Sequence, residues 1–400
     1  MSASRIPALV KAQLIRWARL SAGMDVAQAA RKVGVSQEKL ESWEAEKDRP
    51  TVNQLRKLGE VYKRPLAVFY LPEPPRDFQV QDIRDFRRLA ESATASFSVE
   101  LRFEIRRALF RREVALEMME NLGETPPPFT IRAGLNEDPE EVGARLRSVL
   151  GITRERQTNW HLQGYDAFND VRDAVEACGA LVFQASVPLN EMRGLALYRD
   201  LLPVVIVSSK EQFMAPRLFT LLHEVCHLML HCSAVSNGAE EELDGEAERV
   251  EVFANHVAGA ALLPLDTLLR EPELAGIRHS IARYDTSIER VSRRYRVSRE
   301  TVLRRLLIAR RVTPSAYRTA VKEWRKAFSE MPLRQQSGAP PVHVAELSRA
   351  GRVFPRLVVQ NYREDKITGP EVAEYLNLKL KHLPKIEAEL SGRSPALKRE

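Results

Sequence analysis

The sequence predicts a mainly α fold that contains one small β-sheet, an α+β class. Apolar residues recur at helical spacing in several segments along the chain, whereas only three short runs between residues 180 and 208 have strand character. The apolar fraction of 44% is sufficient for buried cores, and 400 residues suffice for two to three domains. We expect an N-terminal five-helix bundle, a central core that holds the sheet, and a C-terminal helical extension.

The composition also limits the compartment and the partners. No run of eighteen apolar residues exists, and the N-terminus lacks the charged-then-apolar plan of a secretion signal. We therefore expect a cytoplasmic protein with no membrane partner. Three cysteines are too few, and odd in number, for a disulfide framework. The net charge of +7 allows a nucleic-acid partner without requiring one.

Residues 8–71 predict the N-terminal bundle, in which a Gly-Val-Ser turn at residues 34–36 separates two short helices. Ser36 is suited to cap the second of these helices, and Thr51 is suited to cap the next one. The pattern Ala-x-x-x-Gly-Val-Ser-x-x-x-Leu-x-x-Trp-Glu over residues 30–44 resembles the XRE-type helix-turn-helix module. This resemblance implies that the bundle is a five-helix module of that type.

The third helix of such modules reads bases in the major groove with its N-terminal end. Gln37, Lys39 and Ser42 are the candidate DNA contacts here, because their side chains suit bases or phosphates. Glu38 and Glu41 lie on the same helix and oppose the approach of phosphates. DNA binding is the favoured interpretation, and a protein-docking or purely structural role is the alternative.

Prolines at residues 72–75 end the bundle, because consecutive prolines bar both helix and sheet. Residues 97–122 then predict one long helix, since apolar residues such as Leu101 and Ile105 recur at helical spacing. Its arginines are expected to form a solvated face rather than a nucleic-acid patch. These are Arg102, Arg106, Arg107, Arg111 and Arg112.

Two amphipathic helices and a small sheet are expected next. The helices cover residues 138–150 and 165–177, and the strands cover residues 180–185, 194–198 and 203–208. Short loops separate the strands, so we expect them to pair. The edge of a sheet beside a metal site can hold an extended peptide by backbone hydrogen bonds.

An apolar run at residues 219–230 carries His223, Glu224 and His227. On a helix, residues four apart share a face, so both imidazoles can point at one metal ion. Glu224 lies about 100° round the helix, close enough to hold a water molecule on the metal. This is the His-Glu-x-x-His pattern of zinc hydrolases, in which three protein ligands leave one position open. Because burying these polar groups in a core helix is costly, zinc explains them better than hydrogen bonding alone.

The third ligand is expected on the following helix, over residues 246–264. Together with the His-Glu-x-x-His run, this segment resembles the ImmA/IrrE family of metallopeptidase-like proteins, whose second motif is Glu-x-x-Ala-Asn-x-x-Ala-x-x-x-Leu-x-Pro. Alignment on Pro264 requires no gap, and the resemblance assigns the third ligand to Glu251, with Glu248 as the fallback. The chain departs from the family at Val257, where an aromatic residue is usual, and at Cys226, where a small residue is usual.

The resemblance implies a zincin-like peptidase core and a mechanism. Zn²⁺ would be held by His223, His227 and Glu251, with Glu224 as the general base for an attacking water. His256 and Tyr198 are candidates for stabilising the oxyanion, or are ordinary core or rim residues. His231 follows on the same side of the helix and is expected to form hydrogen bonds rather than bind metal.

The chain beyond Pro264 is helical and basic. Residues 287–306 repeat the helix, Val-Ser turn, helix order of the first module, and arginines crowd them. We expect them to complete the fold, with a second DNA-facing surface as the alternative. Residues 367–384 again suggest helix, turn, helix and could bind a partner.

The expected domains are 1–75 (helix-turn-helix), 76–130 (linker and long helix), 131–275 (zinc peptidase core), 276–335 (helical extension) and 336–400 (C-terminal module and tail). Two functions compete. The first is a regulatory zinc metalloendopeptidase that cleaves a specific repressor or antitoxin-type protein, with DNA binding as an accessory. The second is a DNA-binding regulator, or the antitoxin partner of a PIN-type nuclease toxin, with a structural or vestigial metal site.

Overall fold

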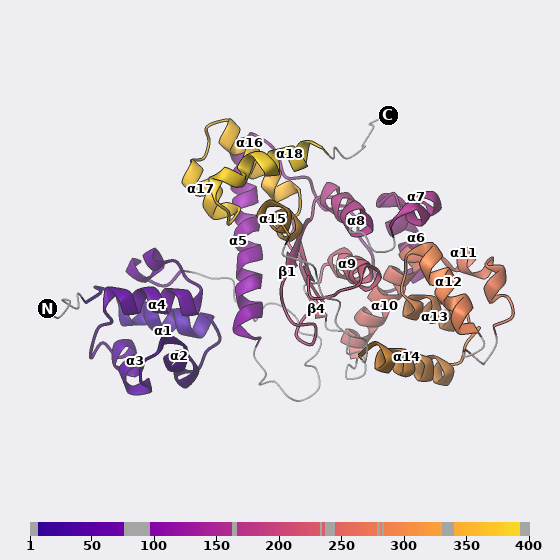
Figure 1. Ribbon diagram of the computed structural model, residues 1–400, viewed down its shortest axis with the longest axis horizontal. Helices are drawn as coiled ribbons and strands as arrows, with labels where there is room; N and C mark the ends of the chain where they lie inside the picture. Colours follow the sequence, from indigo (N-terminus) through magenta and orange to yellow (C-terminus); the bar gives the residue numbers. More distant parts are fainter. Residues whose placement is uncertain are drawn as a thin grey trace. The chain divides into compact units, whose positions relative to one another are not determined.

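The computed structural model describes residues 7–75, 97–161, 166–232, 234–236, 245–277, 281, 284–329 and 340–392 (Figure 1). The prediction of a mainly α fold with a small sheet is confirmed. The chain divides into two compact units, and the described residues of the first are 7–75 and 97–107. Residues from 108 onward form the second unit. Among the described helices, none is both long and apolar enough to cross a membrane.

The first unit contains the expected bundle, and its fifth element is a 3-10 helix. Side-chain caps begin its helices where the sequence predicts them: Ser36 accepts from the Lys39 amide, and Thr51 accepts from the Gln54 amide. Gly34 takes the left-handed conformation at the turn, with φ 81°. The elements are α1 (Ala12–Ser21), α2 (Val26–Val33), α3 (Gln37–Glu44), α4 (Val52–Tyr62) and η1 (Leu66–Tyr70).

Helix α5 (Val99–Asn121) confirms the predicted long helix, but the expectation of a solvated arginine face is wrong. Arg111 and Arg112 are buried. Arg111 forms an ion pair with the buried Glu346, and the Arg112 guanidinium donates to the backbone carbonyls of Leu201 and Leu202. The helical spacing of Leu101 and its neighbours located one apolar face, but a second face of this helix is also covered by the protein.

The sheet has four strands in the order β1-β3-β2-β4. The predicted strands are present as β1 (Leu181–Ala185), β2 (Gly194–Leu197) and β3 (Val204–Ser208). The parallel pair is β1 with β3, and β2 runs antiparallel to both β3 and β4. Strand β4 (Ala234–Ser236) is a fourth strand beyond the three that the sequence predicts.

The two faces of the sheet pack on different helices. Val182, Ala196 and Val205 belong to the core that also contains the apolar residues of α9 (Met214–Met229). Because side chains alternate along a strand, Phe183 faces the opposite way, and its ring packs edge-on against Phe354. The sheet is therefore a middle layer with α9 on one side.

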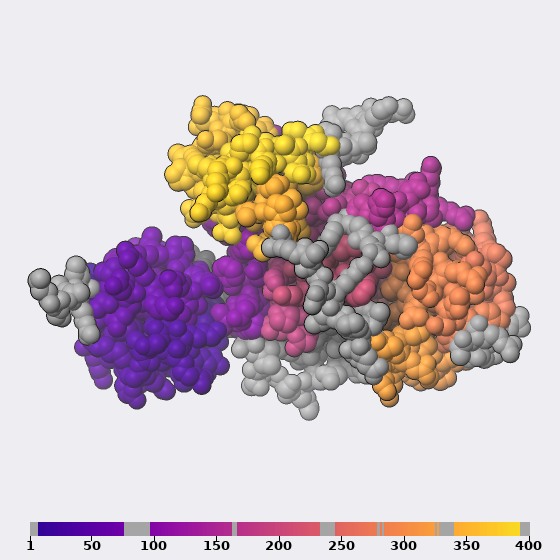
Figure 2. All heavy atoms as spheres, in the orientation of Figure 1, coloured from indigo at the N-terminus to yellow at the C-terminus, as the bar shows by residue number. Residues whose placement is uncertain are grey.

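The remaining helices around α9 share one hydrophobic core. They are α6 (Pro139–Val149), α7 (Arg154–Asn159), α8 (Asp166–Ala177), α10 (Gly245–Leu262), α11 (Leu265–Leu269), η4 (Pro272–Leu274), α12 (Asp285–Tyr295), α13 (Arg299–Ile308) and α14 (Pro314–Ser329). The buried residues of α12–α14, such as Ile288, Leu303 and Val321, join the same core as α9. In Figure 2 these three helices (orange) form one continuous surface with the core helices.

Arg305 of α13 explains why this attachment is firm. Its side chain is fully buried, and both Nη atoms contact Glu140 of α6 at 2.6 Å while Nε donates to the Leu263 carbonyl at 2.8 Å. Arg294 and Arg299 likewise form ion pairs inside the unit. These contacts favour the expectation that residues 287–306 complete the fold over the alternative of a second DNA-facing surface.

The C-terminal helices cover the outer edge of the sheet. They are α15 (Val342–Ala350), α16 (Val353–Arg363), α17 (Gly369–Tyr375), η6 (Leu380–His382) and α18 (Leu383–Ser391). Helix α15 packs along the edge strand β1, where Gln184 Nε2 donates to the Ser348 carbonyl at 2.9 Å. Arg172 Nη1 donates to the same carbonyl at 3.0 Å. An exposed strand edge invites pairing with other chains, and α15 covers this one.

Glu176 fixes the start of α16 from a distant part of the sequence. Its carboxylate accepts from the backbone amides of Arg352 at 3.1 Å and Val353 at 3.3 Å. Gly351 adopts φ +74°, and a side chain there would collide with this carboxylate, so the position requires glycine. Burial raises the pKa of Glu176 to about 7, although Arg172 opposes that shift.

We predict that Glu176→Gln makes the free energy of unfolding of this unit less dependent on pH. A carboxyl group whose pKa rises from 4.5 to about 7 on folding stabilises the protein most below pH 4.5. It loses that contribution, about 3 kcal/mol, as the pH rises through 7. Glutamine is neutral throughout and keeps an acceptor oxygen. Urea unfolding at pH 5 and pH 8 should show a smaller difference for the variant than for the wild type.

The control is Glu155→Gln on α7, which removes an exposed carboxylate and should leave the difference between the two pH values unchanged. Equal differences for all three proteins would show that Glu176 does not titrate in this range.

Candidate metal centre

Helix α9 places the two histidines together in a buried position. His223 is 4% exposed and His227 is 0% exposed, as expected for a helix whose other residues pack on the sheet and on neighbouring helices. Their Nε2 atoms lie 3.0 Å apart, as the spacing of four residues predicts. Two ring nitrogens this close repel each other unless a proton or a cation lies between them.

Glu251 completes the cluster from α10. Its Oε2 lies 3.2 Å from His223 Nε2, and its Oε1 lies 3.1 Å from His227 Nε2. Among the described residues, these three form the group that could hold a metal ion. Ligands at 2.0–2.1 Å from a tetrahedral ion lie about 3.3 Å from one another. The donor set and its separations therefore fit Zn²⁺, with a small outward shift of the side chains.

Glu251 is charged in this setting. Burial alone would raise its pKa, but the charges and hydrogen bonds of His223 and His227 outweigh burial and lower the pKa below its ordinary value. A carboxylate that stays ionised is the form that binds a metal. Glu248, the fallback ligand, is exposed on the same helix and lies outside the cluster.

Asn255 orients the first histidine. Its Oδ1 lies 3.1 Å from His223 Nδ1, and because an amide oxygen only accepts, Nδ1 carries a proton and Nε2 is the ring atom left to bind a metal. The sequence places Asn255 in the second motif but does not indicate its contact with His223. Its position one helical turn after Glu251 was the available signal, because both residues then share a face of α10.

Glu224 is fully buried and lies against strand β2. A Cβ atom added to Gly194 of β2 would overlap Glu224 Oε1 and lie 2.6 Å from Glu224 Cγ. The carboxylate of the candidate general base therefore rests on a strand position without a side chain. The sequence identified β2 as a strand but carried no signal that Gly194 would meet Glu224.

The other candidates near the site have different contacts. The His231 ring stacks on Tyr198 with centroids 4.5 Å apart, and Tyr198 donates to Asp200 Oδ1 at 3.1 Å. His256 Nε2 contacts Glu140 Oε1 at 2.5 Å. All three lie outside the cluster of ligands, and the contact with Glu140 accounts for His256 as part of the packing between α6 and α10.

The candidate DNA-binding residues lie on α3, and each already has a contact within the unit. Gln37 Nε2 donates to Glu41 Oε1 at 2.9 Å, Lys39 pairs with Asp48, and Ser42 Oγ donates to the Lys39 carbonyl at 2.7 Å. Surface ion pairs are weak, so Lys39 can exchange Asp48 for a phosphate. The nearby carboxylates nevertheless oppose the approach of DNA.

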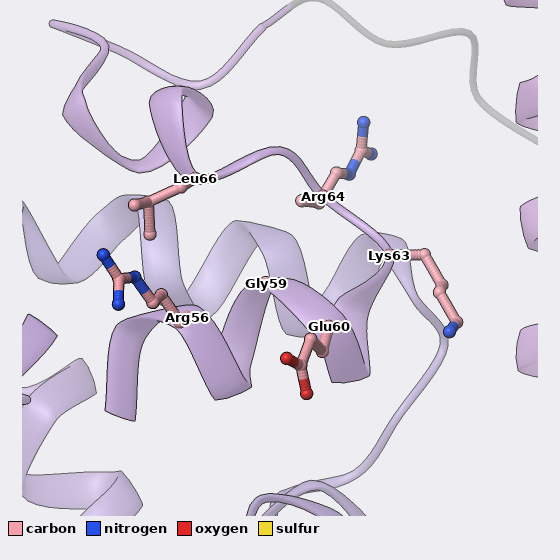
Figure 3. A pocket seen from close by; sticks show the side chains of 6 residues that line it. All are labelled: Arg56, Gly59, Glu60, Lys63, Arg64 and Leu66. Carbon is pink, nitrogen blue, oxygen red and sulfur yellow. The ribbon is translucent and has the colours of Figure 1, made fainter. Parts of the chain in front are cut away.

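A separate hollow of 440 Å³ lies on α4 and the turn that follows it (Figure 3). It opens between Arg56, Glu60 and Lys63, and the Arg64 guanidinium beside it stacks over Trp17 at 4.3 Å. All of its lining residues belong to the first unit, so it is distinct from the cluster on α9 and α10.

We predict that Asn255→Ala lowers the affinity for zinc by about ten- to a hundredfold, the usual effect of losing the partner of a ligating histidine. Asn255→Asp keeps an oxygen acceptor and should retain more of the affinity. Competition against a chromogenic chelator measures both. The control is Val252→Ala, a change at a 59% exposed position of the same helix. Unchanged affinity in Asn255→Ala would show that His223 needs no such partner.

We predict that Asp48→Asn tightens binding to a duplex of mixed sequence by several-fold. The hydrogen bond from Lys39 lowers the pKa of Asp48, so the carboxylate is charged at neutral pH. Its removal leaves Lys39 available for a phosphate, which should steepen the dependence of log K on log salt by about one. Fluorescence anisotropy at two salt concentrations measures both quantities.

Glu60→Gln is the matched control, because it makes the same charge change on α4 of the same unit. An equal gain in DNA affinity for both variants would mean that the affinity depends on the net charge of the protein and not on the position of Asp48. No tightening in Asp48→Asn would remove α3 from the DNA-facing surface.

Comparison with known proteins agrees with this geometry. Residues 176–307 match the family described as the IrrE N-terminal-like domain, a peptidase-type family, and residues 15–69 match the helix-turn-helix family. The first match contains both α9 and α10 and extends to α13. No curated protein and no solved structure matches the chain. The chain therefore carries an IrrE-like, peptidase-type domain behind an N-terminal helix-turn-helix domain, which confirms the resemblance of its motifs to ImmA/IrrE proteins.

Proposed function

We propose that the protein is a zinc-dependent metalloendopeptidase in which His223, His227 and Glu251 hold the ion. The observation that carries the proposal is the meeting of three ligand atoms from two helices, with the carboxylate of Glu224 on the helix that supplies both histidines. Burying these polar side chains raises the free energy of the folded state unless their charges and lone pairs have a partner. A divalent cation is the partner that suits the set.

Asn255 and Glu224 would have separate roles in hydrolysis. Bound zinc supplies a Lewis acid that polarises a carbonyl and lowers the pKa of water. Asn255 keeps the Nε2 lone pair of His223 turned toward the cluster. Glu224 accepts the proton of the attacking water on its carboxylate and delivers it to the leaving amine. Because Glu224 lies inside the protein, away from bulk water, its carboxylate attracts the proton of the attacking water more strongly than a solvated carboxylate would.

We propose that the substrate is one specific protein, such as a repressor or an antitoxin. All three ligand residues are buried, with at most 8% of any one exposed, which suits a site that admits a selected segment rather than any peptide. The helix-turn-helix domain supports a regulatory setting, because this class of domain suggests DNA binding and would bring the peptidase to a DNA-bound target. We expect the protein to act in the cytoplasm.

One observation favours a second candidate, a DNA-binding regulator or the antitoxin partner of a PIN-type nuclease toxin. The three residues of the cluster are buried, and a buried ion between them would hold α9 and α10 together even if no substrate reached it. The peptidase requires zinc, whereas this candidate requires it only if the metal site is structural and not if it is vestigial. Only the peptidase requires the carboxylate of Glu224.

We predict that Glu224→Gln keeps about one zinc ion per chain and loses cleavage by a factor of 10² or more, the usual contribution of a general base. Glu251→Ala should lose the zinc, because two histidines alone bind it weakly. The measurements are the metal content of the purified protein and intact-mass analysis of the products of adjacent genes after co-expression, which reveals a clipped fragment.

Glu248→Ala is the control, since it removes an exposed carboxylate from the same helix and should keep both zinc and cleavage. A Glu224→Gln protein that still cleaves would refute the role of Glu224. A wild type that binds zinc and cleaves none of these products would favour the regulator.

A further inference from the structure

We propose that Gly194 is a positioning residue for Glu224, a role that rests on the proposed peptidase function and deepens it. The absence of a side chain at this point of β2 leaves the space that the Glu224 carboxylate occupies. Three features support this role: α9 approaches the strand closely, Gly194 lies between two paired strands, and a side chain there would meet the Glu224 side chain.

Strand β2 turns its smallest residues toward α9. Gly194 and Ala196 are two apart and therefore face the same side of the sheet, and Ala196 packs in the core with α9. Leu195 and Leu197 point to the opposite side. This alternation of small and large residues lets the helix lie close to the strand at the level of its His-Glu-x-x-His segment.

Gly194 cannot move away to make room. It pairs with Val207 of β3 on one side and with Ser236 of β4 on the other, so the ladder holds its backbone on both edges. The backbone of β2 beside Glu224 is therefore held in place by both neighbouring strands. Its φ lies outside the left-handed region, so the conformation of the backbone does not call for glycine, and the close packing does.

The three atoms nearest to a Cβ added at Gly194 all belong to side chains of α9. They are Oε1 and Cγ of Glu224, and Cγ2 of Thr220 at 2.6 Å. Oε1 is the far end of a flexible side chain, whereas Cγ of Glu224 and the branched Cγ2 of Thr220 lie close to the helix backbone. A methyl group at position 194 should therefore displace the Glu224 carboxylate and also lower the stability of the fold. The displacement alters the geometry of the general base, and the affinity for a ligand of the site reports that effect separately from the loss of stability.

The test uses acetohydroxamate, a small zinc-binding acid that gives its proton to a carboxylate beside the ion. Its affinity for the zinc-loaded protein, measured by calorimetry, reports the position of Glu224 without requiring the natural substrate. We expect Gly194→Ala to bind about one zinc per chain, to melt below the wild-type temperature and to lose about ten- to a hundredfold in affinity for the probe. That loss corresponds to one hydrogen bond to a charged group.

A double-mutant cycle separates this role from a merely structural one. If Gly194 acts only through Glu224, then Gly194→Ala adds no further loss in a Glu224→Gln protein. Ala196→Gly, a change on the same face of the same strand that adds no bulk, should keep the wild-type affinity. If Gly194→Ala fails to fold, combining it with Thr220→Ser removes the other obstructing methyl group.

The outcomes are distinct. Wild-type affinity in Gly194→Ala, or independent losses that multiply in the double variant, would overturn the role of Gly194 and leave the proposed peptidase untouched. A wild-type protein that binds neither zinc nor acetohydroxamate would instead overturn the proposed function.

Discussion

The cost of burying polar groups governs the second unit. Helix α9 is buried along most of its length, yet it carries two histidines and a glutamate, as well as Arg217 and Thr220, among its apolar residues. An unpaired buried polar group costs several kilocalories per mole, so this helix can lie in a core only if those groups meet partners. Glu251 and Asn255 of α10 supply partners for the histidines, which is why the contact between α9 and α10 and the candidate metal centre are the same structure.

The same rule joins distant parts of the chain to this core. Arg305 reaches Glu140 and a backbone carbonyl, Arg111 reaches Glu346, and Glu176 caps a helix that begins at residue 353. Each is a long or charged side chain whose polar atoms are satisfied by an element far away in sequence. Such contacts add little net stability compared with apolar packing, but they tolerate few alternatives, so they select one arrangement of the helices.

The sequence was most informative where a local pattern determines the structure. The caps at Ser36 and Thr51, the spacing of His223 and His227, and the three strands depend on neighbouring residues and could be predicted. The burial of Arg111 could not, because its position on α5 is ordinary for a solvated arginine and the residues that cover it, Phe183 of β1 with Glu346 and Phe354 of the C-terminal helices, are distant in sequence. The contact of Gly194 with Glu224 is also invisible in the sequence, since thirty residues separate them and the spacing follows from how a strand crosses a helix. Asn255 lies between these cases: its motif was visible, but its partner was not.

The arrangement of α15 along β1 has a consequence for the chain as a whole. A protein shortened to end after α14 would retain every residue of the candidate metal centre and the whole segment that matches the IrrE-like family. It would nevertheless remove α15 from the outer edge of β1 and separate Arg111, Arg172 and Glu176 from their distant partners. Such a fragment would tend to self-associate by pairing of its exposed strand edges. The C-terminal helices therefore protect the protein against aggregation.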